Sequence, residues 1–369
     1  MPSVRPFAAG DVDAVAGMFQ RLLRKSRLPA SADLRAYLRT LFLDFCKHDP
    51  DICSRVHVRD DGTVSGFLGV LPFDMRFGDR SVRAAACGTF VSDTRESDPF
   101  AGARLLRDVL SGPQDLSFTE TSNDISTSMW RSMRATPLAP YSLEWLRVLK
   151  PSAFLLAAAA PRLPGLKLLA PLARGADRFV TRRGGQQAWI HYSPAAGRAD
   201  ALVDTEAGND EFAGLCLEFA GRFALRPDWD QTTLETMLGH AERKALHGER
   251  VQRVVRTRAG KPVGLYLYYG DRGGIGRTVQ VMAAAGHEAI VLDRLLRSAS
   301  ERGLAAIRGR TQPNLLQAMI GSKFAFLQTS ATLVHARDPE LLQAAVNGQA
   351  FLNGLAGEGW TRLIGDRFG

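Results

Sequence analysis

The sequence predicts an α/β protein built from two similar domains in tandem, each with a mixed, mostly antiparallel central sheet flanked by helices. The chain has 369 residues, 45% of them hydrophobic, which is long for a single core. Apolar residues switch along it between the period of a helix and that of a strand. The same order of elements then occurs twice, about 180 residues apart. We expect a first domain at 1–150, a helical Pro/Gly-rich linker at 151–190 and a second domain at 191–369.

The first copy opens with a short strand, "SVRPF", followed by two amphipathic helices, "DVDAVAGMFQRLLRKS" and "SADLRAYLRTLFLDFC". Asp11 and Ser31 are suited to cap them, because their side-chain oxygens can accept from free N–H groups of the first turn. Three strands follow as a meander: "SRVHVRD", "VSGFLGVLPFDMRFG" and "RSVRAAACGTFVS". The copy is completed by helix "FAGARLLRDVLS", strand "LSFTE", a helix around "ISTSMWRSMRA" and the extended "YSLEWLRVLK".

The second copy repeats this layout. Two helices, "DEFAGLCLEFAGRF" and "QTTLETMLGHAERKAL", precede a meander of "RVQRVVRTR", "KPVGLYLYYG" and "GRTVQVMAAA". Helix "HEAIVLDRLLRSASERG", strand "AAIRGR", helix "PNLLQAMIGSKFA" and a last strand around "SATLVHARD" follow. The glycine-rich "GDRGGIGR" lies between the last two strands of the meander. We interpret it as a hairpin turn, since glycine adopts positive φ without a Cβ penalty.

The composition also limits where in the cell the protein is expected and which partners it is expected to bind. The most apolar stretch, 151–173, is interrupted by Arg162, Lys167 and four prolines, so it does not predict a membrane span. The N-terminus lacks the apolar segment of a signal peptide, and the four cysteines form no CxxC pair, so we expect a cytoplasmic protein with reduced thiols and no metal. The net charge of +9 attracts acidic partners, although the arginines are scattered along the chain.

The order of elements resembles the GNAT acyltransferase superfamily, here as a tandem. The opening "VRPFAAGDVDAVAGMFQRLLR" is similar to that family's first strand and helix. The segments "DDGTVSGFLGVLPFDMRFGDRSVRAAACGTFVSD" and "RAGKPVGLYLYY" look like its central meander. The resemblance implies an acyl-CoA or acyl-carrier co-substrate between the fourth and fifth strands, with its pyrophosphate on the N–H groups at the start of the next helix.

The phosphate-binding segment that this resemblance implies is 92–106 in the first copy. Gly102 and Ala103 are small enough for close approach, and Arg95 and Arg104 can reach phosphate oxygens. The family's Q/R-x-x-G-x-G/A spacing is absent there, and in the second copy Glu288 at the helix start would repel a pyrophosphate. The first copy is therefore the expected donor site. Its expected donor-binding residues are Phe90, Val91, Arg95, Ala101, Gly102, Ala103, Arg104, Asn123 and Trp130.

The chemistry of acyl transfer calls for a base and an acid. The resemblance implies a tyrosine acid in the context N-x-x-A-x-x-x-Y, but "NDISTSMW" has Trp130 at that position after Asn123, and the second copy has Gly321. Indole is too weak an acid to protonate a thiolate. For the base we expect Glu120, at the end of the fifth strand, with Asp93 as a second candidate. The other reading of Glu120 is a solvated strand end, and that of Asp93 is a helix cap.

Three functions remain open from the sequence. The leading one is an N-acyltransferase that moves an acyl group from acyl-CoA or acyl carrier protein to an amine of a small molecule or amino sugar. The second is a Fem-type transferase that uses aminoacyl-tRNA, which the basic charge would suit. The third is a non-catalytic binding protein built on a degenerate tandem. The acceptor, the acyl length and the oligomeric state are not encoded in any motif.

Overall fold

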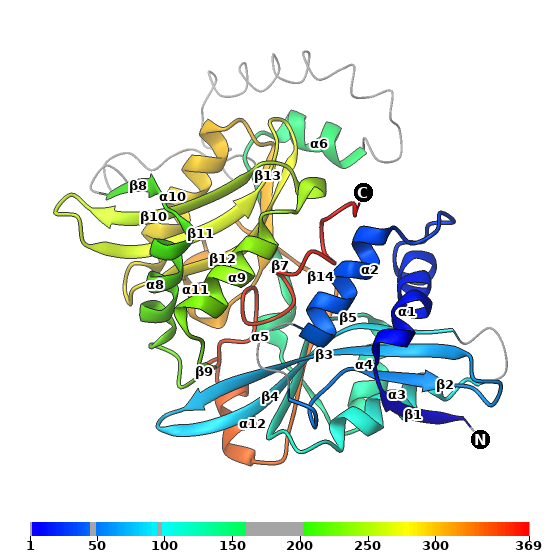
Figure 1. Cartoon of the computed structure of the whole chain (residues 1–369). Helices are drawn as coiled ribbons and strands as arrows, with labels where there is room; N and C mark the ends of the chain where they lie inside the picture. The colour runs from blue at the N-terminus through cyan, green and yellow to red at the C-terminus, as the bar shows by residue number, and fades with distance from the viewer. Residues whose placement is uncertain (1, 45–48, 94–97, 160–201, 369) are drawn as a thin grey trace.

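The computed structural model describes residues 2–44, 49–93, 98–159 and 202–368, and within them the chain forms two mixed sheets with helices around and between them (Figure 1). The first sheet has the order β1-β2-β3-β4-β5-β15-β6, with β9 paired to β3. The second has the order β14-β7-β13-β12-β11-β10-β8. In each sheet the pairs are antiparallel except one, β4 with β5 and β12 with β13. The predicted fold class is confirmed.

The strands of the first sheet are those of the first meander, its flanking strands and three short additions. Their bounds are β1 Ser3–Pro6, β2 Arg55–Val58, β3 Val64–Phe77, β4 Arg80–Ser92, β5 Leu116–Ser122, β6 Thr136–Pro137, β9 Leu225–Pro227 and β15 Ala331–Ala336. Those of the second sheet are β7 Leu143–Val148, β8 Leu202–Glu206, β10 Arg250–Thr257, β11 Pro262–Tyr269, β12 Ile275–Ala283, β13 Ala306–Arg310 and β14 Ala325–Gln328.

The two copies exchange a strand. Strand β7 follows the helices of the first copy in sequence, yet it pairs with β13 and β14 of the second sheet. Strand β15 near the end of the second copy pairs with β5 and β6 of the first sheet. The sequence predicted both strands but placed each in its own copy. Because each sheet contains a strand from the other copy, the two copies are interlocked. The domain boundaries at 150 and 191 stay a prediction.

The helices form three layers around these sheets. Their bounds are α1 Val12–Met18, α2 Ala32–Arg39, α3 Ala101–Leu110, α4 Asp124–Ser132, α5 Ala139–Ser142, α6 Pro151–Ala159, α8 Asn209–Ala220, α9 Gln231–Ala241, α10 Glu288–Glu301, α11 Pro313–Met319 and α12 Pro339–Val346. Helix α3 and Trp130 of α4 pack on one face of the first sheet, and α10 and α11 pack on one face of the second. Side chains of α1, α2, α8 and α9 share the large core between the sheets. Of the expected linker, 151–159 is helix α6, and most of the rest lies outside the described residues.

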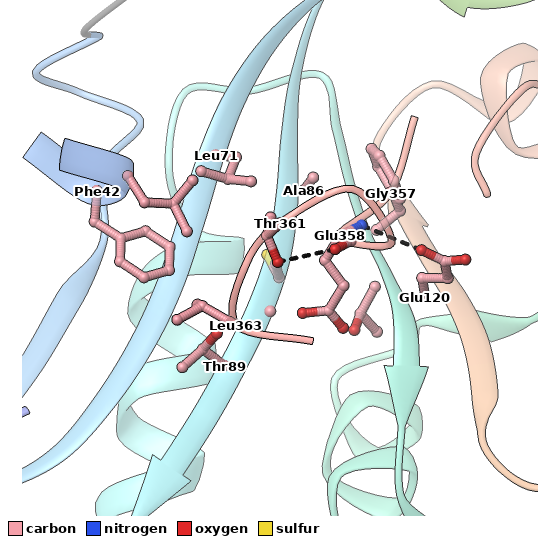
Figure 2. A pocket seen from close by; sticks show the side chains of 14 residues that line it. Phe42, Leu71, Ala86, Thr89, Glu120, Gly357, Glu358, Thr361 and Leu363 are labelled. Atoms are coloured by element: carbon pink, nitrogen blue, oxygen red, sulfur yellow. Dashed lines mark hydrogen bonds between the residues drawn. The ribbon is translucent and has the colours of Figure 1, made fainter. Parts of the chain in front are cut away.

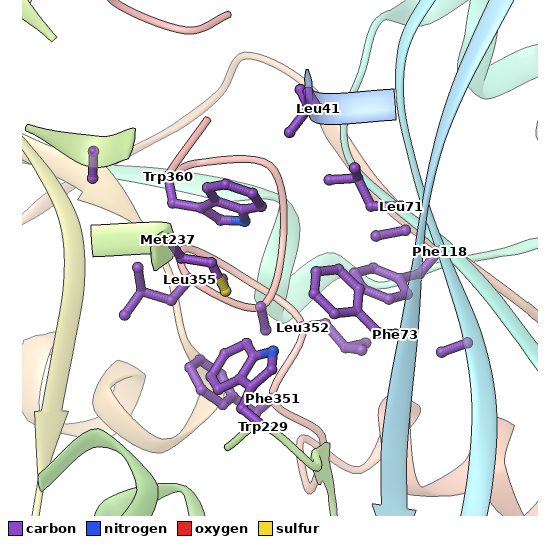
Figure 3. Close-up of a cluster of buried hydrophobic side chains, with 14 of the residues drawn as sticks. Leu41, Leu71, Phe73, Phe118, Trp229, Met237, Phe351, Leu352, Leu355 and Trp360 are labelled. Atoms are coloured by element: carbon purple, nitrogen blue, oxygen red, sulfur yellow. The ribbon is translucent and has the colours of Figure 1, made fainter. Parts of the chain in front are cut away.

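The C-terminal segment, 347–368, runs through this central core (Figure 3). Its side chains Phe351, Leu352, Leu355 and Trp360 are each at most 2% exposed. Trp229 packs edge-on against Phe351 at 5.8 Å between ring centroids. The segment therefore fills the space between the two copies, and its apolar residues belong to the interior of the protein.

The hairpin interpretation of "GDRGGIGR" is confirmed. Strands β11 and β12 pair as antiparallel neighbours on either side of it, and Gly273 has a φ of 78°. That backbone conformation is strained for a residue with a Cβ. Among the described residues, no helix combines the length and apolar character needed to cross a membrane.

The position of Trp360 gives a test of this arrangement. The substitution Trp360→Ala removes a side chain with no exposed surface, and we expect the free energy of unfolding to fall by about 3–5 kcal/mol. Val346→Ala on α12, where 44% of the residue is exposed, is the matched control and should change it by less than about 0.5 kcal/mol. Equal, small effects in urea titrations of both variants would show that the C-terminal segment does not pack between the copies.

Candidate functional site

The candidate site lies where strands β4 and β5 separate. The two strands pair only through Ala84–Ala86 of β4 and Leu116–Phe118 of β5. Beyond these residues, each strand pairs only with its other neighbour in the sheet. Opposite Phe67 and Gly69 of β3, strand β4 contains one extra residue, and Thr89 in this bulge has a φ of 51°. A bulge leaves a backbone group of the extra residue outside the ladder. The strands thus open beside a backbone N–H that the sheet does not use.

A small cavity occupies this opening (Figure 2). Its walls come from β3, β4, β5, the end of the α2 region and the C-terminal segment. They include Leu41, Phe42, Leu71, Ala86, Gly88, Thr89, Phe118, Glu120, Gly357, Glu358, Thr361 and Leu363. The cavity measures only about 10 Å³ for a water-sized sphere, which is room for about one water molecule.

Glu358 of the C-terminal segment is the acid that faces the bulge. Thr121 of β5 donates its hydroxyl hydrogen to Glu358 Oε1, and the Thr89 backbone N–H is a further donor to this carboxylate. A Cβ on Gly88 would lie 2.2 Å from Glu358 Oε2, so only glycine leaves room for the carboxylate there. The pKa of Glu358 is raised to about 7. Burial is the main cause and the nearby Glu120 adds to it, while these donors and Arg310 act in the opposite direction.

Glu120 holds the segment that carries Glu358. Its carboxylate oxygens accept from the backbone N–H group of Gly354 at 3.0 Å and from that of Glu358 at 3.1 Å (Figure 2). The residue is 4% exposed, and burial raises the pKa of its carboxyl group. Sequence reasoning placed Glu120 beside the acceptor amine as a base, whereas the structure gives both of its oxygens to the backbone of the C-terminal segment. Because the residue is buried, the alternative interpretation of Glu120 as a solvated strand end is wrong.

Asp93, the second expected base, lies away from this cavity. Its carboxylate forms an ion pair with Arg21 at 2.6 Å, and its backbone carbonyl accepts from Arg59. Neither contact involves a residue that lines the cavity. The structure therefore brings Glu120, and not Asp93, together with the bulge.

Helix α3 is the next helix after β4, and its N-cap residue Phe100 has no side-chain cap, although the carboxylate of Asp98 accepts from the N–H of Phe100 at 3.0 Å. The free N–H groups of its first turn and the helix dipole make such an end favourable for an anion. Gly102 belongs to this turn, and a Cβ there would lie 3.3 Å from Met129 Sδ and 3.5 Å from the Phe90 ring. Ala101 is buried beneath the same turn. The small residues allow a close approach at this helix end.

The structure places the other expected donor-binding residues in different environments. Arg104 reaches Asp98 at 3.0 Å, and His57 Nε2 lies 3.2 Å from the same carboxylate. Asn123 caps α4 by accepting from the N–H of Ser126 at 2.9 Å. Val91 and Trp130 are buried in the hydrophobic core, with 5% and 1% exposed, so their side chains are not available to a donor. Arg95 lies outside the described residues.

The equivalent helix end in the second copy is already occupied by protein groups. Arg222 donates to the carbonyl of Ala283, the last residue of β12, and forms an ion pair with Glu288 at 2.9 Å. A carboxylate in the first turn and an arginine across it compensate each other. The start of α3 has a comparable pair, because Asp98 accepts from the N–H of Phe100 at 3.0 Å and also pairs with Arg104. The choice of the first copy as the donor site therefore stays a prediction.

Sequence reasoning missed Glu358. It belongs to "LNGLAGEGWTRL", a segment in which the sequence analysis predicts no site residue. A signal was present, because Glu358 is an isolated acid among Gly354, Gly357 and Gly359 in an otherwise apolar stretch. Its distance from the first copy along the chain concealed its place in that copy's cavity.

Comparisons with known proteins agree with this architecture. A conserved protein of unknown function from Enterococcus faecalis V583, designated a probable N-acyltransferase, superposes with a TM-score of 0.59 at 10% identity, over 91% of this chain and 73% of that one. A GCN5-related N-acetyltransferase from Anabaena variabilis ATCC 29413 gives 0.58 at 11% identity, over 92% and 74%. One from Kribbella flavida gives 0.52 at 13% identity, over 92% and 72%.

The chain thus has the GCN5-related N-acetyltransferase fold, as the sequence resemblance implied. No protein-family model matches it, and no curated protein matches its sequence. At these identities the likeness extends to the fold, and the site must be argued from its own residues.

The raised pKa of Glu358 predicts a pH-dependent stability. Its carboxyl binds a proton more tightly in the folded chain, with a pKa of about 7 against 4.5. The stabilisation is complete below pH 4.5 and is lost as the pH rises through 7. It amounts to about 2–3 kcal/mol. Glu358→Gln should make this decline smaller and leave the part that comes from Glu120, whose pKa is also raised by burial, whereas Glu301→Gln at the exposed end of α10 should retain the full decline. Urea titrations from pH 4.5 to 8 measure it, and parallel curves for wild type and Glu358→Gln would contradict the assignment.

Proposed function

We propose that this chain is an N-acyltransferase that transfers the acyl group of acyl-CoA to an amine of a small molecule. The reaction takes place where β4 and β5 separate in the first sheet. One observation carries the proposal: the carboxylate of Glu358 lies buried against the backbone N–H of Thr89 in the β4 bulge. The fold supports it, because this opening is where a tandem of this type would admit an acyl-CoA.

The donor would be held by the end of β4 and the first turn of α3. The first turn of α3, at Ala101 and Gly102, and the helix dipole favour the negative charge of a pyrophosphate. Phe90 and Met129 flank Gly102 there. When bound, the donor supplies an activated thioester, and its acyl end would enter the opening between β4 and β5.

Thr89 contributes its backbone N–H to the thioester carbonyl. That oxygen gains negative charge as the amine attacks, and a donor fixed in a buried bulge stabilises it without reorganisation. One donor of this kind is worth about 3 kcal/mol in the transition state. In the present structure the Glu358 carboxylate uses the same N–H, so the two groups compete for one donor.

Glu358 acts as the general base. With a pKa of about 7, it is ionised often enough at neutral pH to accept a proton and basic enough to take one from an ammonium or attacking amine. The C–N bond forms as the C–S bond breaks, and the proton held by Glu358 can pass to the departing thiolate. This route needs no tyrosine, which agrees with Trp130 and Gly321 standing at the family's tyrosine positions.

The C-terminal segment must shift for substrates to enter, because the cavity has room for about one water molecule. Gly354, Gly357 and Gly359 give the segment around Glu358 the backbone freedom to do so. Leu41, Phe42, Leu71 and Leu363 line the entrance on the side of α2. An amine carried on an apolar group is therefore the acceptor that this wall favours.

Donor binding is tested by isothermal titration with acetyl-CoA and a long-chain acyl-CoA. We expect Gly102→Glu to weaken binding at least about tenfold, since it adds a negative charge and bulk at the turn that receives the pyrophosphate. Gly239→Glu is the matched control, because it adds the same charge on α9, where no atom lies within 4 Å of the added Cβ. Equal affinities for both variants would remove the donor from the first copy.

The role of Glu358 is tested by the pH profile of kcat/KM with an amine identified in an acceptor screen. Activity should rise with pH through about 7, because the base works when ionised. Glu358→Gln should lower kcat by about 10²–10⁴ and abolish this inflection, while Glu301→Gln should leave both unchanged. An inflection that persists in Glu358→Gln would assign the base to another group.

A further inference from the structure

The second copy contains a group of cations at the place that corresponds to the catalytic cavity of the first. In the first sheet the parallel pair ends at Ala86 and Phe118, which line that cavity. In the second sheet it ends at Arg277 and Arg308. The second copy thus has two arginines, paired directly across the strands, where the first copy has two apolar residues that line the cavity.

The side chains of Arg277 and Arg308 lie on one face of the second sheet. The neighbouring Gly276 and Ile307 face the other side, where Leu304 packs against them. Adjacent strands are about 4.8 Å apart, so the two arginines extend side by side. The positive charge of Arg308 lowers the pKa of Arg277, next to the larger effect of burial.

Lys244 and His247, which follow α9, complete this group. Burial lowers the pKa of Lys244 to about 7, and Arg277 lowers it further, while Asp366, Glu120 and Glu358 raise it. Burial also lowers the pKa of His247 to about 3, aided by the charges of Arg277, Lys244 and Arg308. All four groups therefore share one electrostatic environment that disfavours additional positive charge.

The protein compensates this charge only in part. Glu144 of β7 forms an ion pair with Arg308 at 3.1 Å, and its other oxygen accepts from Thr329. Lys244 donates to the backbone carbonyls of Thr361 and Ile364. Within the described part of the chain, the Arg277 guanidinium forms no hydrogen bond and no ion pair of its own, and only the more distant charge of Glu144 attracts it.

An arginine cannot relieve such burial by losing its proton, because its pKa is too high. The Arg277 residue is half-buried, so water screens its charge only in part and a partner from solution is expected. Arg308 retains 37% of its side-chain surface, which leaves the pair accessible. Two parallel guanidinium forks match the oxygens of a phosphate group, whose two negative charges balance them.

We propose that Arg277 and Arg308 form a binding site for the phosphate group of a small molecule in the second copy. This site is separate from the catalytic cavity and does not rest on the acyltransferase assignment. The phosphate can belong to a phosphate monoester or to a coenzyme A molecule bound to the second copy. Their shared chemistry is a dianion that two arginines hold together.

The test is isothermal titration of the full chain with inorganic phosphate at constant ionic strength, set with chloride. We expect wild type to bind phosphate and Arg277→Gln to bind it at least about tenfold more weakly. Arg272→Gln is the matched control: it removes an equal charge from the exposed turn before β12 and should bind as wild type. No binding by wild type, or equal binding by wild type and Arg277→Gln, overturns the proposal. Loss of binding in Gly102→Glu alone also overturns it, since the phosphate would then occupy the α3 helix end.

A second readout separates a ligand site from a structural arginine. Without phosphate, Arg277→Gln should raise the Tm by about 2 °C, because an uncompensated charge is removed, and added phosphate should raise the Tm of wild type alone. A fall in Tm for Arg277→Gln in phosphate-free buffer contradicts the proposal. Titration with coenzyme A then identifies the source: weaker binding by Arg277→Gln assigns the phosphate to the coenzyme, and unchanged binding, with phosphate binding lost, assigns it to a monoester.

Discussion

The carboxylate of Glu120 accepts hydrogen bonds from the backbone N–H groups of Gly354 and Glu358, and the centre of the molecule is arranged around this contact. Burying a carboxylate costs several kcal/mol unless its oxygens are bonded, and each bond from a neutral donor to a charged acceptor returns about 1.5–3 kcal/mol. The pair therefore persists only while the C-terminal segment stays in place. In turn, the segment delivers Glu358 to the β4 bulge. A strand residue that sequence reasoning assigned to catalysis thus positions the residue that the proposal assigns to it.

The exchange of β7 and β15 makes this contact durable. Arg310 of the second sheet donates to the backbone carbonyl of Glu120 in the first, and it also reaches the carbonyls of Ser142 and Ser330 beside the exchanged strands. Glu120 and Arg310 lie two residues beyond the last parallel pair of their sheets. Corresponding positions of the two copies therefore meet at the centre with opposite charge. Separating the copies would expose an acid and an arginine that each sheet buries against the other.

The sequence predicted what depends on local pattern. The helices around Val15, Leu38 and Leu105, the meanders and the turn at Gly273 follow from period and glycine, and all are present. Ser31 caps its helix as expected, whereas Asp11 does not cap α1, because its carboxylate accepts from the N–H of Ala8 and pairs with Arg5. The sequence predicted the wrong partners for strands that pair with residues far away in the sequence. Nothing within "YSLEWLRVLK" distinguishes pairing with β5 from pairing with β13, since either neighbour buries Trp145 equally well. The same limit concealed Glu358, which lies 238 residues from its anchor Glu120.

The two copies keep one backbone geometry and use it for different chemistry. Both have a bulge in the last strand of the meander, at Thr89 and between Gln280 and Thr278, and in both the parallel pair ends just before it. In the first copy burial raises the pKa of Glu358 towards neutrality, which suits proton transfer. In the second, Arg277 and Arg308 replace two apolar wall residues, and no carboxylate there could stay protonated beside them. A duplicated opening thus allows one copy to carry out acid–base chemistry and the other to bind an anion, because the charge of two wall positions decides which protonation states the opening can hold.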